Sequence, residues 1–210
     1  MIPDILISRN DIFRMDKPVT PEISHVAATP AFDDLASTVI PVAEFDEAAS
    51  EITQWEGYSP TPLYGLASLA KEVGVAAILY KHEGPRFGLG SFKALGGAYA
   101  AQKVLARELS RLAGKVVSLT DVRNGACAGE ADGITLVSAT DGNHGRSLAW
   151  GCNRFGAQCR IYIHANVSPG RERAMQDVGA EVVRISGDYD ESVKICREEF
   201  ASTNNDWTIV

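Results

Sequence analysis

Short apolar runs alternate with helix-length amphipathic segments through the second half of the chain, and this alternation restricts the possible folds more than any other feature. The apolar runs have the length of buried strands and lie at residues 134–140, 159–165, 181–186 and 207–210. The segments between them space apolar residues at helical intervals and lie at residues 144–156, 168–180 and 188–202. Strands that alternate with helices of about 10–15 residues form parallel βαβ units, which cover the strands on both faces. We therefore predict an α/β fold with a parallel sheet.

The first half of the chain is less regular. We expect a helix at 43–55, a proline-stiffened turn and a second helix within 59–75, a strand at 76–83, a long helix at 92–113 and a connection at 114–133. The hydroxyl of Ser91 can accept a hydrogen bond from one of the first free amides of the long helix.

These segments predict four parts of the chain. They are an N-terminal extension (1–40), the first part of a larger domain (41–132), a small α/β domain (133–205) and a returning strand (206–210). The returning strand stops at Val210 with no helix after it, so we expect the chain to be the N-terminal part of a longer protein.

Charge and composition exclude several classes of partner. The net charge of −7, with Lys and Arg scattered along the chain, disfavours binding to nucleic acid and to an anionic membrane surface. No apolar run is long enough for a membrane span, and the N-terminus lacks the pattern of a secretory signal, so we expect a cytoplasmic protein. The four cysteines include no CxxC pair, which predicts reduced thiols and no metal site.

A lysine stands inside the glycine-rich stretch FGLGSFKALGGAYA, residues 87–100. A Walker phosphate loop would need Ser or Thr after Lys93, and a dinucleotide fingerprint would need glycine in its place. A lysine used for covalent chemistry fits better, since a helix N-terminus and partial desolvation both disfavour its ammonium form. The alternative is an exposed surface lysine. The glycine pair Gly96 and Gly97 favours the covalent reading, because it lets another group approach the helix.

A second candidate segment, ATDGNHG at 139–145, joins a strand to a helix. Ligands of parallel sheets bind beyond the carboxyl ends of the strands, where free helix amides attract a carboxylate or a phosphate. Residues 140–144 therefore form a candidate anion cradle. The alternative is an ordinary turn in which Asp141 or Asn143 caps the helix.

Together the two segments carry a resemblance to a known family. The order TPL, KHE, GSFK and TDGNHG resembles that of the fold type II pyridoxal-phosphate enzymes. Within that group, GYSPTPL, RFGLGSFKALGGAYA and ATDGNHGRSLAW are most similar to the diaminopropionate ammonia-lyase family, over about Tyr58 to Val210. The resemblance implies two domains with parallel, three-layer sheets, of which the C-terminal half is absent here. His82 departs from the acidic residue that is frequent at its position.

The resemblance also implies a reaction and its site residues. Pyridoxal phosphate would be bound covalently by Lys93, whose amine would also remove the Cα proton of the substrate. Asp141 would accept a hydrogen bond from the second amino group of a diamino acid substrate. It would also act as base for the substrate isomer whose Cα hydrogen points away from Lys93. Asn143 would hydrogen-bond the phenolate oxygen of the cofactor. The remaining substrate-binding residues would be Thr140, Gly142 and His144.

The implied activity is the α,β-elimination of D- and L-2,3-diaminopropionate, a small amino acid, to pyruvate and ammonia by a homodimer of the full-length protein. The glycine-rich phosphate loop and a second catalytic aspartate would follow Val210. Two rivals stay open: a serine/threonine dehydratase-like lyase, which would tolerate a hydroxyl residue in place of Asp141, and a truncated chain without catalytic activity. We expect Arg86 and Arg146 to be surface charges.

Overall fold

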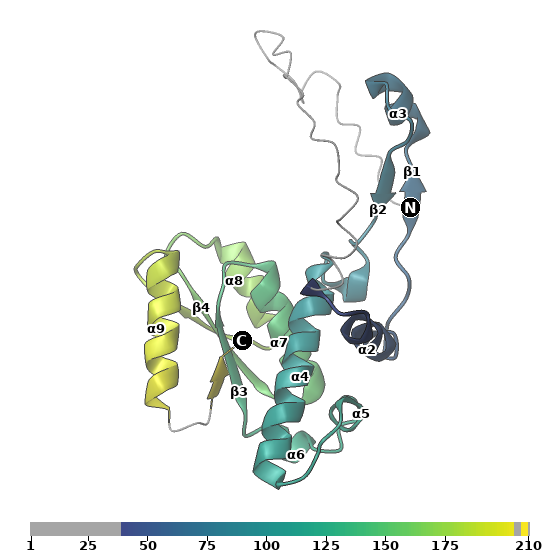
Figure 1. Ribbon diagram of the computed structural model, residues 1–210. Helices are drawn as coiled ribbons and strands as arrows, with labels where there is room; N and C mark the ends of the chain where they lie inside the picture. Colours follow the sequence, from purple (N-terminus) through teal and green to yellow (C-terminus); the bar gives the residue numbers. More distant parts are fainter. Residues whose placement is uncertain (1–38, 204–206, 210) are drawn as a thin grey trace. The chain divides into compact units, whose positions relative to one another are not determined.

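The computed structural model describes residues 39–203 and 207–209, the last three through their backbone alone (Figure 1). The predicted N-terminal extension lies almost wholly outside the described residues. The helices are α2 (Val42–Ile52), α3 (Ala67–Val73), the 3-10 turn η1 (Arg86–Gly88), α4 (Lys93–Ala113), α5 (Leu119–Arg123), α6 (Ala128–Ala131), α7 (Asn143–Phe155), α8 (Pro169–Gln176) and α9 (Tyr189–Ser202). The strands are β1 (Leu63–Gly65), β2 (Leu79–Lys81), β3 (Thr135–Ala139), β4 (Gln158–Ile163), β5 (Glu181–Arg184) and β6 (Trp207–Ile209).

The central sheet has four parallel strands in the order β5-β4-β3-β6. This confirms the parallel α/β fold predicted from the alternation of strands and helices. In the ladder between β3 and β4, Thr135 lies opposite Gln158 and Ala139 lies opposite Tyr162. The carboxyl ends of these two neighbouring strands therefore finish at the same edge of the sheet.

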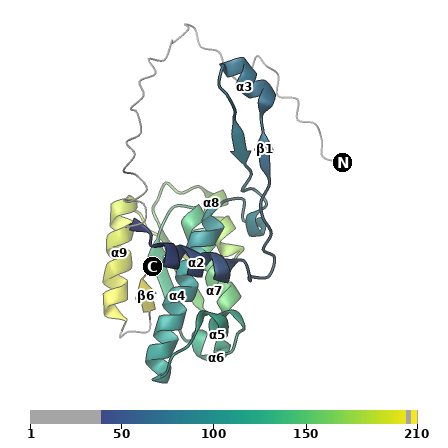
Figure 2. The same cartoon turned by 45° about the vertical axis from the view of Figure 1, so that its right-hand side comes forward.

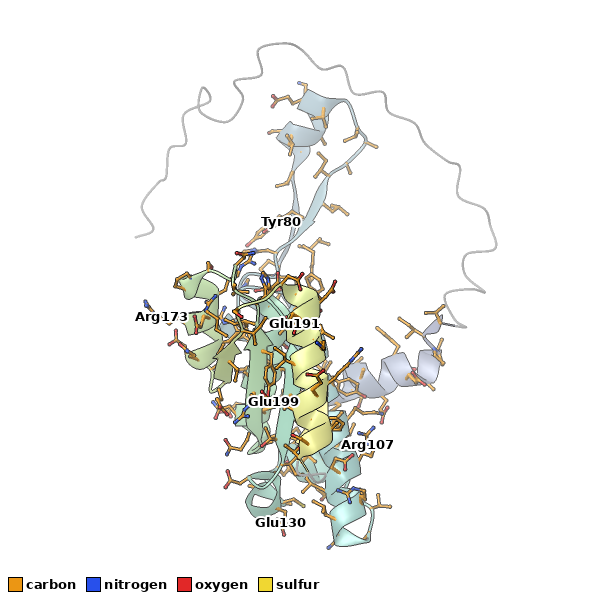
Figure 3. The ribbon with its side chains drawn as sticks, turned by 90° about the vertical axis from the view of Figure 1, so that its left-hand side faces the viewer. Tyr80, Arg107, Glu130, Arg173, Glu191 and Glu199 are labelled. Atoms are coloured by element: carbon orange, nitrogen blue, oxygen red, sulfur yellow. The ribbon has the colours of Figure 1, made fainter. Side chains whose placement is uncertain are left out.

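Helices cover both faces of this sheet (Figures 1 and 2). Successive side chains of a strand point to opposite faces. Accordingly, Ile161 and Ile163 belong to the core cluster that includes residues of α4, α7 and α8, whereas Tyr162 packs on the other face against α9. The Tyr162 hydroxyl donates a 2.5 Å hydrogen bond to Glu199 of α9, which Figure 3 labels.

Helices α4 and α7 approach each other closely. A Cβ atom at Gly97 would lie 2.5 Å from Ser147 Oγ, and one at Gly151 would lie 2.7 Å from the Cα atom of Ala98. A Cβ atom at Gly96, in contrast, would meet nothing within 4 Å. The approach that the glycine pair predicted is therefore made by α7, and it depends on Gly97.

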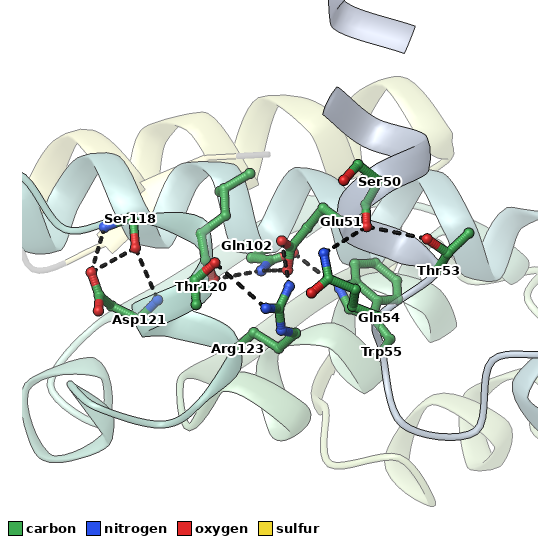
Figure 4. A network of polar contacts seen from close by, with 11 residues as sticks. Ser50, Glu51, Thr53, Gln54, Trp55, Gln102, Ser118, Thr120, Asp121 and Arg123 are labelled. Atoms are coloured by element: carbon green, nitrogen blue, oxygen red, sulfur yellow. Dashed lines mark hydrogen bonds and ion pairs between the residues drawn. The ribbon is translucent and has the colours of Figure 1, made fainter. Parts of the chain in front are cut away.

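A buried polar network ties α2 to α4 and α5 (Figure 4). The amide of Gln102 accepts a hydrogen bond from Trp55 Nε1 at 3.2 Å and donates to Glu51 at 2.6 Å and to the Leu119 carbonyl at 2.8 Å. Arg123 pairs with the other carboxylate oxygen of Glu51 at 2.5 Å. Each buried polar group of the network thus has a partner, which avoids the free-energy cost of an unpaired one.

Two segments differ from the predictions. Part of the turn expected near residue 63 is strand β1, which pairs antiparallel with β2; three exposed residues are too few for an alternating pattern to be visible in the sequence. The connection predicted at 114–133 contains α5 and α6. α5 begins with a reciprocal capping box between Ser118 and Asp121. The spacing of these two residues is a helix-start signal that the sequence contained.

The described residues from Ala43 onward group into one compact unit. A continuous core cluster extends from Trp55, after α2, to Ala180 before β5. The domain boundary at residue 132 stays a prediction, because this core spans both of its sides. No helix in the described ranges is long and apolar enough to cross a membrane.

Candidate functional site

A cavity of about 450 Å³ lies where strands β3 and β4 end and helices α4, α7 and α9 begin. Its lining is Lys93, Ala139, Thr140, Asp141, His144, His164 and Tyr189. This is the edge at which parallel sheets bind ligands. The folded chain therefore brings the two candidate segments of the sequence to one cavity.

Lys93 is the first residue of α4, as the sequence predicted for a helix N-terminus. Its backbone N–H donates to the hydroxyl of Ser91 at 3.2 Å, so Ser91 does accept one of the first free amides of the helix. The Lys93 side chain is exposed. Within the described part of the chain, Lys93 is therefore not desolvated as we expected, although it lines the cavity.

The turn between β3 and α7 is not built by side-chain capping. α7 begins at Asn143 after Gly142, and no side chain caps its N-terminus, so the alternative in which Asp141 or Asn143 merely caps the helix is wrong. Asp141 is exposed, and its Oδ2 atom forms an ion pair with Nη1 of Arg171 on α8 at 3.6 Å. Gly142 and Asn143 do not line the cavity.

Thr140 and His144 complete the turn. The backbone N–H of Thr140 donates to the Tyr162 carbonyl at 3.1 Å, so the hydroxyl of its buried side chain is the donor that Thr140 can offer to a ligand. Burial, and secondarily the charge of Lys93, lower the pKa of His144 below its ordinary value of 6.5. His144 is therefore neutral at pH 7 and adds no positive charge to the cavity.

Sequence reasoning missed two residues that line the cavity, His164 and Tyr189. His164 directly follows β4, and Tyr189 is the first residue of α9, which follows β5. A survey of the last residues of each predicted strand would have found His164, which lies at the carboxyl end of the strand predicted at 159–165, because such residues share one edge of a parallel sheet.

A polar network connects the TPL and KHE segments to the turn before Lys93. Arg86 is buried and binds both carboxylate oxygens of Glu83, at 2.8 and 2.9 Å. Thr61 donates its hydroxyl to Glu83, and its carbonyl accepts a bond from Lys81 Nζ. The expectation that Arg86 is a surface charge is wrong, since a carboxylate three residues earlier compensates its burial. Arg146 is half-buried and donates to the Leu89 carbonyl at 2.9 Å, so it is no free surface charge either.

The network makes a prediction about acid stability. The bonds from Arg86, aided by Thr61 and opposed by burial, lower the pKa of Glu83 from 4.5 to about 2. This stabilisation is fully present above pH 4.5, the unfolded-state value, and is lost as the pH falls through about 2. Replacing Glu83 with glutamine should lower the free energy of unfolding by about 2–3 kcal/mol at pH 7 and by much less near pH 2.

Urea unfolding of the wild-type chain and the Glu83→Gln variant across this pH range measures the difference. Glu130, an exposed residue of α6 that Figure 3 labels, provides the matched control, because Glu130→Gln removes a carboxylate with no partner among the contacts described. Equal pH dependence of the two variants would contradict the prediction.

The sequence matches a family model described as "Pyridoxal-phosphate dependent enzyme" over residues 54–210. A curated relative, the diaminopropionate ammonia-lyase of Escherichia coli (strain K12), is 37% identical over 154 residues, which are 73% of this chain and 37% of the relative. The chain therefore spans little more than a third of the length of that relative.

Solved structures of the Escherichia coli diaminopropionate ammonia-lyase have a similar fold. The apo form matches with a TM-score of 0.69 and 32% identity, over 78% of this chain and 42% of that one. The complex with an aminoacrylate-PLP azomethine reaction intermediate matches with a TM-score of 0.66 and 29% identity, over 88% of this chain and 42% of that one.

Proposed function

Because the chain belongs to the family of pyridoxal-phosphate dependent enzymes, we propose that it is part of a carbon-nitrogen lyase that converts 2,3-diaminopropionate, as the D and the L isomer, to pyruvate and ammonia. One observation carries this proposal: Lys93 and Asp141 line the same cavity at the end of the parallel sheet. The curated relative named above, which is 37% identical over 154 residues, is a diaminopropionate ammonia-lyase.

The residues around the cavity fit the cofactor of the family. Lys93 lines the cavity and carries a primary amine that can bond to an aldehyde. Asn143 directly precedes the cavity-lining His144, and its exposed side-chain amide can donate to a phenolate oxygen. Lys93 and Asn143 are thus the residues of this chain that would hold pyridoxal phosphate. When bound, this group supplies an electron sink that makes the Cα proton of an amino acid easier to remove.

Lys93 and Asp141 divide the proton transfers between them. Lys93 takes the Cα proton from the isomer whose hydrogen faces α4. Asp141 takes it from the other isomer, and its carboxylate also accepts the second amino group of the substrate, since a cationic group prefers an anionic partner. The side chain of Thr140 and the first free amides of α7, at Gly142 to His144, hold the substrate carboxylate.

The proposal is tested by supplying the full-length protein, loaded with pyridoxal phosphate, with each isomer of 2,3-diaminopropionate. We expect one pyruvate for each molecule consumed, together with two of ammonia, from both isomers. Release of ammonia from L-serine or L-threonine, with no ammonia released from either diaminopropionate isomer, would instead favour a dehydratase. Absence of any release with bound cofactor would reject the proposed activity.

Replacing Asp141 with serine separates the two lyase readings. We expect ammonia release from 2,3-diaminopropionate to fall by about 10²–10⁴-fold, the usual contribution of an acid/base group. The matched control is Asp177→Ser, an exposed carboxylate at the end of α8. A dehydratase-like enzyme would keep its activity on hydroxyl-bearing substrates in the Asp141→Ser variant, and that result would contradict the role given to Asp141.

Location, assembly and domain organisation also belong to the proposal. We place the protein in the cytoplasm, as a homodimer, with residues 41–132 in a larger cofactor domain and residues 133–205 in a smaller one. Light scattering of the full-length protein tests the dimer, and limited proteolysis near residue 132 tests the boundary.

A further inference from the structure

His164 lies at the cavity in register with Asp141. The ladder between β3 and β4 pairs Ala139 with Tyr162, and Asp141 and His164 stand two residues beyond these partners. Neighbouring parallel strands lie about 4.8 Å apart. Both side chains line the cavity, so a substrate as small as 2,3-diaminopropionate can meet both.

The loop that carries His164 is firmly held. Arg184 Nη1 donates to the Ala165 carbonyl at 2.8 Å and to the His164 carbonyl at 3.3 Å, while its Nη2 pairs with Glu172 at 2.6 Å. The N–H of Ala165 also donates to the Gly187 carbonyl at 3.1 Å. These bonds fix the backbone from which the imidazole projects.

One hydrogen bond fixes the tautomer of the ring. The backbone N–H of Asn166 donates to His164 Nδ1 at 3.3 Å, which requires an unprotonated Nδ1. The proton of the neutral imidazole is then on Nε2. No other hydrogen bond to this ring is present in the part of the chain that the structure describes. His164 thus offers one N–H donor that the protein does not use.

We propose that His164 contacts the substrate, donating its Nε2–H to the amino-acid carboxylate while Asp141 accepts the second amino group. This inference rests on the proposed function. A donor cannot pair with an ammonium, which is itself only a donor, so the carboxylate is the partner that the substrate offers. His164, after β4, then pairs with the negatively charged carboxylate of the substrate. Asp141, after the neighbouring strand β3, pairs with its positively charged second amino group.

Two variants of His164 separate substrate contact from a structural role in the full-length, cofactor-loaded protein. His164→Gln places an amide N–H near the position of Nε2, whereas His164→Asn places its amide near Nδ1 and loses the donor. We expect His164→Asn to raise KM for 2,3-diaminopropionate by about tenfold with kcat little changed, and His164→Gln to stay within about threefold of wild type.

The reverse order would overturn the inference, because a residue that only anchors Asn166 should tolerate asparagine better than glutamine. An unchanged KM in His164→Asn would overturn it as well. In both of these cases, turnover of 2,3-diaminopropionate by the wild type would still support the proposed function.

A measurement without turnover distinguishes the failure of this inference from the failure of the proposed function. In protein with ¹⁵N-labelled histidine, we expect His164 as the Nε2–H tautomer, identified by the loss of its signal in His164→Gln. L-Alanine, which has no β-leaving group, should shift this signal more than L-alaninamide, which has no carboxylate. If the wild type releases no ammonia but shows this shift, the proposed reaction fails and the contact stands. An Nδ1–H tautomer, or equal shifts, would overturn the contact.

Discussion

Replacing Lys93 with alanine is expected to reduce the release of ammonia from 2,3-diaminopropionate by 10³-fold or more, on the order of what removal of a covalent nucleophile costs. The lysine is the exposed first residue of α4 and lines the cavity that Asp141 and His144 also line. The variant should also lose the absorbance band of covalently bound pyridoxal phosphate, because Lys93 is the one lysine among the described residues that lines this cavity.

A second lysine on the same helix gives the control. Lys103 is half-exposed and pairs with Glu47 at 2.8 Å, away from the cavity. Lys103→Ala should keep both the absorbance band and the activity within about threefold, since an exposed ion pair contributes little to stability. Borohydride reduction followed by peptide mapping should label position 93 in the wild type. Labelling of another lysine would reject the assignment.

Replacing Gly97 with alanine is expected to destabilise the chain by a net of about 2 kcal/mol. The new Cβ would stand 2.5 Å from Ser147 Oγ and 3.1 Å from the backbone nitrogen of Leu148, so α4 and α7 would have to move apart. Such overpacking costs about 3 kcal/mol, of which the better helix propensity of alanine offsets about 1 kcal/mol.

The adjacent glycine makes the comparison sharp. A Cβ at Gly96 meets nothing within 4 Å, so Gly96→Ala should stabilise the chain by up to about 1 kcal/mol. The two variants, one residue apart, should therefore differ by about 3 kcal/mol in urea unfolding. Equal free energies of unfolding would contradict the prediction, because they would mean that α4 and α7 can move apart with little loss of stability.

The sequence predicted the features that depend on local pattern. Apolar runs of strand length gave the parallel sheet, and the glycine-rich stretch placed Lys93 at a helix N-terminus, as found. Contacts between segments that are distant in the sequence were harder to predict. β1 is too short to carry a pattern, and Arg86 is buried only because Glu83 and Thr61 surround its guanidinium.

The candidate site shows the same division. The segment from Thr140 to His144 is recognisable in the sequence as a strand end that leads into a helix, whereas His164 and Tyr189 follow other strands, β4 and β5. Their presence follows from the order β5-β4-β3, which sets which strand ends are neighbours. A single sequence specifies the strands but does not directly display that order.

The glycine contact between α4 and α7 has a consequence for how the lysine is aimed. Lys93 and Gly97 stand one helical turn apart on the same side of α4, and His144 and Ser147 are similarly related on α7. Inserting one residue between Lys93 and Gly97 would swing the amine by about 100° around the helix axis and shift it by about 1.5 Å. The number of residues in this turn therefore sets the direction of the amine. Substitutions within the turn should be far better tolerated than a change in its length.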